Sequence, residues 1–436
     1  MKVTAIIAEY NPIHNGHIKH IETARLKTGA DYIIAVMSGD YVQRGAPAVI
    51  SKYERAKAAL MAGADLVIEL PFYYSCSSLE YFAKGAVSLI AKTGVVDCIS
   101  FGSECGDINS LIEAAGIMHD LNRSDDPSIR KKLSGGFSFS HAINTSDDIP
   151  ENIRKILSTP NNLLAAAYIS AAKDFRGGFA FHTMKREGAA YHDDSSFALS
   201  STSLRKDILN VQREQPEREI SLHNILKDRI SDEILRSLLS CLDRYTAVSE
   251  DDLSLMLFAR IQDILRTAAC DDADPVEVLT SFLDVSKSLA NRIKAAYSHA
   301  ASYTALCSEI KSKDINYSRI SRALLHILLD IKKDRMDEYV KDGYNYYIRP
   351  LGFKKDSSGL LHEIKHCASV PLISKAADHA DILRSFYLPD APDICSHALR
   401  MFGENTAAAD LYEKTVCSLS RQPFISEYEQ ALPVIF

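Results

Sequence analysis

Four short apolar runs in the first hundred residues constrain the fold of this chain more than any other feature. Stretches of helical length, with apolar residues spaced along one side, separate the runs, which indicates strands that alternate with helices. Such alternation is typical of an α/β fold with a parallel, doubly wound sheet. The runs are Val3–Ala8, 32–37, Leu66–Leu70 and 98–101.

Capping residues and glycines mark the helices between these strands. Ser51 and Glu54 form a Ser-x-x-Glu capping box, and Gly63 is expected to end that helix. Farther along, the pattern predicts a polar, loop-rich segment at 127–159, an alanine-rich helix at 160–172 and a strand at 179–185. From about residue 210 onward the apolar spacing is mostly helical. We therefore predict an α/β domain at 1–209 and a mainly α-helical domain at 210–436.

A His-x-Gly-His element follows the first strand almost directly. Ligands of parallel sheets bind beyond the carboxyl ends of the strands, where His14, Gly16 and His17 lie. A helix that begins at about Asn15, with this residue as its N-cap, would aim backbone N–H groups and two imidazoles at a phosphate. The alternative is a glycine turn that carries two surface histidines. The strand-turn-helix context favours the phosphate site.

A second hydroxyl-rich element follows the last predicted strand. The stretch 200–205 reads Ser-Ser-Thr-Ser-Leu-Arg, so Ser201 and Thr202 would begin a helix and Arg205 would follow one turn later. Hydroxyls, free backbone N–H groups and a guanidinium suit the phosphates of a nucleotide. Taken alone, the element could equally be a Ser/Thr cap beside a surface arginine. Together with His-x-Gly-His it indicates a nucleotide site with two phosphate-binding ends.

Composition limits the class of protein and the compartment. The 436 residues are 46% hydrophobic and 25% charged, without a signal peptide or an apolar run long enough for a membrane span, so we expect a cytoplasmic globular protein and no membrane partner. Nine scattered cysteines, none in a Cys-x-x-Cys pair, predict reduced thiols and no structural metal. The net charge is −7, yet residues 311–335 hold seven Lys/Arg and three Asp, a local charge of +4 that could bind phosphates.

With these elements the chain resembles the HIGH-type nucleotidyltransferase superfamily and, within it, the bacterial tRNA(Met) cytidine acetate ligases. The resemblance covers nearly the whole chain, and its motifs are long and occur in the family's order. The matching stretches are 9–17, 37–39, 43–47, 65–71, 101–104, 160–162, 191–193 and 201–205. Ile13, where an aromatic residue is usual, and the pair Asp40-Tyr41 depart from the pattern, which leaves acetate selectivity less defined than ATP binding.

The resemblance implies a Rossmann-like nucleotidyltransferase domain followed by the helical domain. It also implies ATP-dependent activation of acetate to acetyl-adenylate and acetyl transfer to N4 of the wobble cytidine in elongator tRNA(Met). The implied catalytic residues are His14, His17 and Arg205. The expected ATP contacts are Ile7, Ala8, Glu9, Tyr10, Asn11, His14, Gly16, His17, His20, Gly102, Asn161, Asn162, Arg186, Ser201 and Thr202.

Several roles within the site stay open at the level of sequence. Either Asn161 or Asn162 could face ATP, and Lys185 could replace Arg186 as the phosphate ligand. Mg²⁺ is expected to bridge the phosphates, and Asp40 or Glu104 could order it. The alternatives are a turn-forming Asp and a helix N-terminal Glu.

A substrate as large as tRNA requires a basic surface, and the helical region supplies candidates. The predicted tRNA-binding residues are Lys311, Lys313, Arg319, Arg322, Arg349 and Lys354, with tyrosines between them that could stack on bases. Charges on solvated helix faces are the alternative. Two rival functions remain: a small-molecule adenylyltransferase or acetate ligase of the citrate-lyase-activating type, and a catalytically inactive nucleotide-binding RNA adaptor. No feature of the sequence sets the oligomeric state.

Overall fold

A six-stranded sheet forms the centre of the protein. The computed structural model describes residues 1–123, 149–175, 178–186, 201–213, 218–312 and 315–430. The strands lie in the order β7-β6-β1-β2-β5-β8, and all neighbours pair in parallel except β5 and β8. Their bounds are Val3–Ala8 (β1), Tyr32–Ser38 (β2), Leu66–Leu70 (β5), Cys98–Ser103 (β6), Ala180–Lys185 (β7) and Pro350–Phe353 (β8). The predicted parallel sheet is confirmed, and its strand order reverses between β1 and β6.

Helices cover both faces of the sheet because both faces of its strands are apolar. Val3 and Ala5 belong to one core, and Ile6 belongs to the other. The first core is shared with α4 (Leu79–Thr93), α5 (Ile108–Arg123) and α9 (Pro160–Ala172). The second is shared with α1 (Asn15–Thr28), α2 (Lys52–Met61), α10 (Ser201–Arg213), α11 (Arg218–Leu226) and α12 (Asp232–Arg244).

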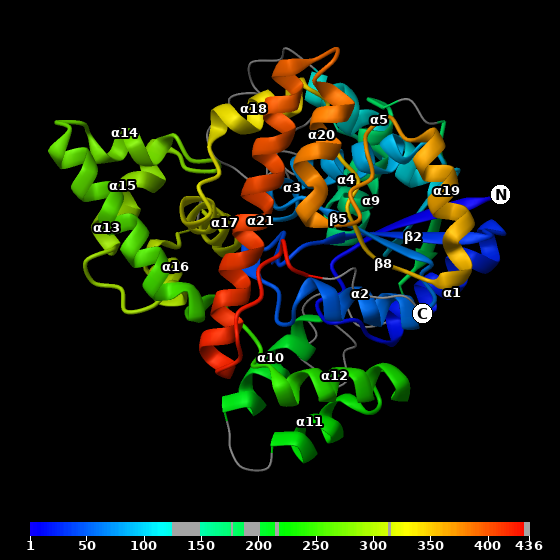
Figure 1. Cartoon of the computed structure of the whole chain (residues 1–436), viewed down its shortest axis with the longest axis horizontal. Coiled ribbons are helices and arrows are strands. Elements are labelled where there is room, and N and C mark those ends of the chain that lie inside the picture. The colour runs from blue at the N-terminus through cyan, green and yellow to red at the C-terminus, as the bar shows by residue number, and fades with distance from the viewer. Residues whose placement is uncertain (124–148, 176–177, 187–200, 214–217, 313–314, 431–436) are drawn as a thin grey trace.

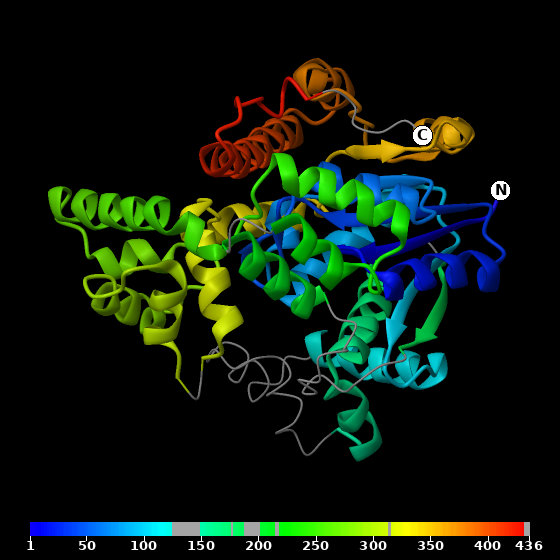
Figure 2. The same cartoon turned by 90° about the horizontal axis from the view of Figure 1, so that it is seen from below.

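The remaining chain is mainly helical, as predicted. Figure 1 shows α13–α16 projecting from one side of the molecule and α19 on the opposite side, and Figure 2 shows α19–α21 with β8 along one edge of the sheet, away from β7. The longer helices are α13 (Ser254–Cys270), α15 (Lys287–Ala296), α16 (Tyr303–Ile310), α17 (Tyr317–Leu328), α18 (Lys333–Lys341), α19 (Ser358–Cys367), α20 (His379–Tyr387) and α21 (Pro392–Ser420). The short elements are β3 (Tyr41–Val42), β4 (Ala46–Pro47), α3 (Phe72–Ser75), α8 (Glu151–Leu157), α14 (Pro275–Thr280) and the 3₁₀ turns Glu250–Leu253, Lys355–Ser357 and Ala376–Asp378.

Two predictions about segments need correction. The stretch 127–159 is not loop throughout, because α8 occupies 151–157, while 124–148 lie outside the described residues. The helical region is not separate from the sheet, because β8 pairs with β5, and the expected boundary at 209/210 falls inside α10. An edge strand of four residues is too short for its apolar pattern to predict a strand from sequence.

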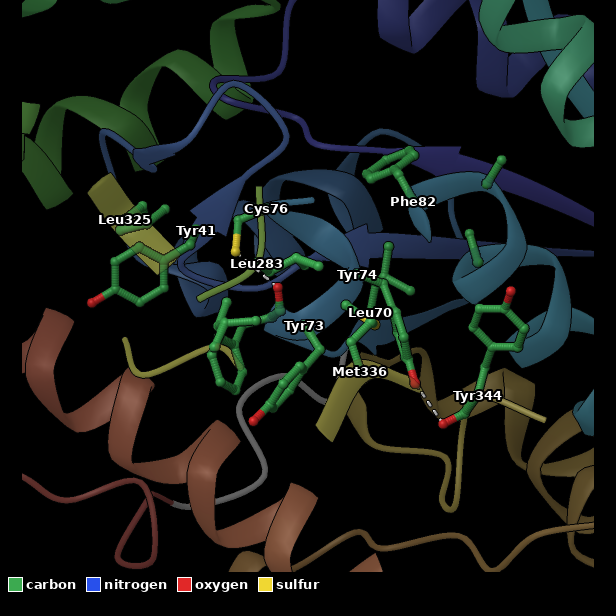
Figure 3. Packing of buried hydrophobic residues seen from close by; sticks show 14 of the residues in the cluster. Tyr41, Leu70, Tyr73, Tyr74, Cys76, Phe82, Leu283, Leu325, Met336 and Tyr344 are labelled. Carbon is green, nitrogen blue, oxygen red and sulfur yellow. Dashed lines mark hydrogen bonds between the residues drawn. The ribbon is translucent and has the colours of Figure 1, made fainter. Parts of the chain in front are cut away.

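The sheet and the helical region share one buried core. Figure 3 shows Tyr74 and Cys76, which follow β5, packed among side chains of the helical region such as Met336. The hydroxyl of Tyr74 donates to the carbonyl oxygen of Tyr344 at 2.6 Å. The two parts are therefore joined by both apolar and polar contacts.

The cysteines lie mostly in the core. All nine cysteines are free thiols, and six of them are buried, so most serve as small core residues. Among the helices of the described ranges, none is long and apolar enough to cross a membrane.

Candidate nucleotide-binding site

The loop after β1 presents the two histidines at the start of α1. Helix α1 begins at Asn15, as expected, but its N-cap is His14, whose Nδ1 accepts the Gly16 backbone N–H at 3.1 Å. The prediction of Asn15 as the cap was therefore wrong by one residue. Gly16 has a steric reason to lack a side chain, since a Cβ there would lie 2.9 Å from Cε1 of His14.

The imidazoles of His14 and His17 form a stacked pair. Their ring centroids are 3.8 Å apart, and Nδ1 of His17 accepts the backbone N–H of His14 at 3.3 Å. Burial, with Arg186 nearby, lowers the pKa of His14 to about 4 and that of His17 well below its usual value. Because Nδ1 is an acceptor in both neutral rings, the proton of each ring is on Nε2. The pair therefore offers two N–H donors to a ligand.

Arg186 connects this pair to the ends of β6 and β7. It follows β7, and its positive charge contributes to lowering the pKa values of His14, His17 and His20. Its Nη1 donates to Oδ1 of Asn161 at 3.4 Å. The predicted residues His14, His17, His20, Asn161 and Arg186 are thus brought to the reversal point of the sheet, where ligands of such folds bind.

Glu104 closes the same region from the end of β6. Its carboxylate accepts the backbone N–H groups of Asn161 and Asn162, at 3.1 and 2.7 Å, at the N-terminus of α9. In return, Oδ1 of Asn162 accepts the backbone N–H groups of Glu104 and Cys105. These hydrogen bonds give Glu104 the helix-terminal role that was the alternative to metal binding. Gly102 lies beside Arg186, since a Cβ there would be 3.3 Å from Cγ of that arginine.

The second phosphate element folds back onto the first. Ser201 begins α10, and its hydroxyl donates to the carbonyl oxygen of Pro12 at 3.4 Å. The guanidinium of Arg205 donates to the carbonyl oxygen of Asn11 at 2.8 Å and to Oγ1 of Thr202 at 3.0 Å. The structure therefore brings the two motifs together, although Ser200 and 191–193 lie outside the described residues.

One residue that supports the loop was missed at the level of sequence. Arg55 of α2 is fully buried, and its guanidinium donates to the carbonyl oxygens of Glu9, Ser38, Gly39 and Ile50. It therefore ties the loops after β1 and β2 to each other. The sequence feature that could have revealed this role is an arginine on the apolar side of the helix predicted after Ser51.

Asp40 belongs to a buried ion cluster around Lys52. Its Oδ1 accepts the backbone N–H of Lys52 at 2.8 Å, and Nζ of Lys52 lies 2.8 Å from Glu69 and 2.9 Å from Glu427. Burial raises the pKa of Asp40 to about 6, against the opposing effect of Lys52. Within the described ranges no three His, Cys, Asp or Glu residues form a group able to hold a metal ion.

The predicted tRNA-binding residues do not form one cluster. Lys311 is exposed at the end of α16 and Arg319 lies on α17, whereas Nε of Arg322 pairs with Asp284 at 3.0 Å. Arg349 is only 4% exposed and pairs with Glu427 at 2.9 Å, so it is not a surface residue. Lys354 directly follows β8, a strand on the side of the molecule away from α16 (Figure 1), and Lys313 is outside the described residues.

The fold and the paired histidines define a nucleotidyl transferase. Residues 1–422 match the model of the HIGH Nucleotidyl Transferase family. The tRNA(Met) cytidine acetate ligase of Thermoanaerobacter sp. (strain X514) is 36% identical over 423 residues, covering 94% of this chain and 95% of the relative. The enzyme of the same name from Caldanaerobacter subterraneus is 36% identical over 420 residues, with the same coverage.

A solved structure agrees over the full length. Thermotoga maritima TmcAL, in a crystal structure bound with alpha-thio ATP, superimposes with a TM-score of 0.85 at 27% identity, covering 100% of this chain and 99% of that one. The apo crystal structure of the same protein gives the same TM-score. This chain belongs to the family of tRNA(Met) cytidine acetate ligases.

Proposed function

We propose that this protein is an ATP-dependent acetate ligase that forms acetyl-adenylate and transfers the acetyl group to N4 of the wobble cytidine of elongator tRNA(Met). The names of the relatives and the ATP analogue bound to the T. maritima protein support the substrates. The observation that carries the chemistry is the gathering of His14, His17, Arg186 and the Ser201–Arg205 element at the reversal point of the sheet.

In the first step, acetate attacks the α-phosphate of ATP and pyrophosphate leaves. Both reactants are anions, so the site must supply donors for the negative charge that develops on the phosphate oxygens. The Nε2–H groups of His14 and His17 are neutral donors, and Arg186 adds a cation. Arg205, which holds the Asn11 carbonyl oxygen, keeps the second phosphate element against the first.

In the second step, the cytidine N4 amine attacks the carbonyl carbon of acetyl-adenylate. The new amide bond forms as AMP leaves, and the amine loses one proton. We propose that Mg²⁺ accompanies ATP and is held mainly by the phosphates, as is usual for this cation, since the described part of the chain contains no three-residue ligand group. A tRNA substrate would place the reaction in the cytoplasm.

We propose residues 210–436 as the part that binds tRNA. Lys311 and Arg319, on neighbouring helices, keep their predicted role, because both lie in the segment of positive local charge. The buried position of Arg349 argues for a structural role instead. We define this part of the chain by its proposed function and not as a separately folded domain, because its strand β8 belongs to the sheet.

The test is a pair of histidine variants assayed with ATP, acetate and tRNA(Met). We expect His17→Ala to lower pyrophosphate release and N4-acetylcytidine formation by about 100-fold or more, the loss typical of removing one donor to a developing oxyanion. The exposed His299, which is not part of the nucleotide site, provides the control, and His299→Ala should retain full pyrophosphate release. Wild-type turnover in His17→Ala would remove this residue from the mechanism.

The same assay separates the rival functions. Acetyl transfer to a small molecule in the absence of RNA would indicate a citrate-lyase-activating type of ligase. Tight ATP binding without acetyl-adenylate formation would indicate an inactive adaptor. Acetylated cytidine in tRNA(Met), quantified by mass spectrometry of the digested nucleosides, is the expected outcome.

A further inference from the structure

A buried hydroxyl joins two imidazoles beside the nucleotide site. Oγ of Ser100 lies 3.0 Å from Nε2 of His20 and 3.0 Å from Nδ1 of His182. The three side chains come from β6, α1 and β7. Ser100 has no solvent exposure, and its register partner on β7 is His182, so the parallel pairing itself places the second imidazole next to the hydroxyl.

The hydrogen count at Ser100 restricts the two rings. A hydroxyl has one proton to donate, and in the described structure its only hydrogen-bond partners are the two ring nitrogens. A buried O–H without an acceptor is costly, so one imidazole must accept from Ser100 while the other donates to it. The protonation of Nδ1 in His182 therefore decides the tautomer of His20.

Two arrangements satisfy this count. In the first, Nε2–H of His20 donates to Ser100, which donates to Nδ1 of His182, and Nδ1 of His20 is left with a lone pair. In the second, Nδ1–H of His182 donates to Ser100, which donates to Nε2 of His20, and the proton of His20 is on Nδ1. Only the second arrangement lets Nδ1 of His20 donate a hydrogen bond.

His20 lies next to the paired histidines of the nucleotide site. His20 follows His17 by one turn of α1, and both His17 and Arg186 interact electrostatically with it. Burial lowers the pKa of His20 to about 4, so the ring is neutral at pH 7 and has a single N–H. Phosphate oxygens carry lone pairs only, so a donor at Nδ1 suits them and a lone pair there repels them.

We propose that Ser100 and His182 are positioning residues that hold His20 as its Nδ1–H tautomer, so that it donates to a phosphate oxygen of ATP. This inference rests on the proposed function in one respect, the identity of the nucleotide. His14 and His17 have the opposite tautomer, because backbone N–H groups occupy their Nδ1 atoms. The site would then present three neutral N–H donors from successive turns of one helix.

Two nearly isosteric variants of His182 separate the arrangements. In His182→Asp the carboxylate can only accept, so Ser100 must donate to it and His20 must donate to Ser100, which forces the wrong tautomer. In His182→Asn the amide N–H can still donate to Ser100. We expect the KM for ATP to rise about tenfold in His182→Asp, roughly the loss of 1.4 kcal/mol, and to stay within about threefold in His182→Asn, with kcat changed less than KM in both.

The tautomer itself is read by ¹⁵N NMR of histidine-labelled protein at pH 8 with α,β-methylene-ATP bound. His20, assigned from the spectrum of His20→Gln, should carry its proton on Nδ1 in the wild type and in His182→Asn, and on Nε2 in His182→Asp. A second pair of variants repeats the test: Ser100→Ala removes the hydroxyl, and Ser100→Thr keeps it. Unchanged spectra of His14 and His17 show that each variant is folded.

An Nε2–H tautomer of His20 in the liganded wild type would overturn the proposal, as would equal KM values for the Asp and Asn variants. Failure of the proposed function looks different. If the wild type made no acetyl-adenylate while His20 still showed the Nδ1–H tautomer with the analogue bound, the reaction assignment would fall and the positioning role would stand.

Discussion

Lys52 is the residue whose removal should most clearly reveal what holds the C-terminal segment on the sheet. Its ammonium, 1% exposed as a side chain, lies between Glu69 of β5 and Glu427 near the C-terminus, at 2.8 and 2.9 Å. Lys52→Met keeps the length of the side chain and removes the charge. Glu427 would keep Arg349 at 2.9 Å and the hydroxyl of Tyr53 at 2.8 Å. Of the ion pairs that the described residues make with Glu69, the one with Arg349 at 3.7 Å would remain.

The magnitude follows from the carboxylates that Lys52→Met leaves without their ammonium. Breaking a buried ion pair by removing one partner typically costs about 3–5 kcal/mol. Burial already raises the pKa of Asp40 to about 6 against the opposing effect of Lys52, so without Lys52 the cluster binds a proton more readily, and that proton is easier to supply at pH 5 than at pH 7. Lys52→Met should therefore be much less stable at pH 7 and only slightly less stable at pH 5.

Urea denaturation followed by far-UV circular dichroism measures the loss, since the chain has no Trp for a fluorescence signal. The matched control is Glu69→Gln, which removes the charge of Glu69 and leaves Lys52 paired with Glu427. In the double variant Lys52→Met/Glu69→Gln no carboxylate of Glu69 remains to be neutralised, so its loss should be at least about 2 kcal/mol smaller than the sum of the single losses. A loss below about 1 kcal/mol at pH 7, or one that is the same at pH 5 and pH 7, would refute the reasoning.

Two further predictions test the turn against α17 and the protonation state of the histidines. Gly45→Ala should lower the free energy of unfolding by about 2–5 kcal/mol in urea denaturation, because φ is +78° and the new Cβ would clash with the backbone of Arg322. Gly29→Ala is the control, since φ there is +65° but a Cβ would have nothing within 4 Å. It should lower the free energy of unfolding by only about 1–2 kcal/mol. The pKa values of His14 and His20, lowered to about 4, predict a KM for ATP without a step near pH 6.5. Because the unfolded chain binds these protons first, stability should fall as pH drops from about 6.5 to 4; a step in KM near 6.5 would contradict the neutral state.

The strands, the helix starts and the two phosphate elements could be predicted because they depend on local signals. Apolar runs set β1, β2, β5 and β6, and the proline and asparagines at 160–162 set the start of α9. The two phosphate motifs could be linked because both lie at ends of strands or starts of helices. His14 as the cap was missed because asparagine is much the commoner N-cap residue.

The remaining features depend on contacts between distant parts of the chain. Glu69 lies 17 positions after Lys52 and Glu427 lies 375 positions after it, and no local pattern relates them. The same holds for Arg349, which looks like a basic surface residue in the sequence and lies in that cluster in the structure. Ser100 and His182 are paired only through the register of β6 and β7, which a single sequence does not reveal.

The helical region and the nucleotide site are connected through buried polar groups, which limits how they can move. In the turn between β3 and β4, the carbonyl oxygen of Gly45 accepts hydrogen bonds from the hydroxyls of Tyr303 and Ser321, on α16 and α17. In the same turn, the backbone N–H of Gln43 donates to the carboxylate of Glu9 in the loop after β1. Pulling α16 and α17 away would leave the carbonyl oxygen of Gly45 without these two donors, at about 1–3 kcal/mol for a buried group. For a tRNA bound as proposed, near α17, we infer an ATP site already fixed in place, so that acetyl transfer requires the tRNA loop to reach the site rather than the two parts of the protein to close.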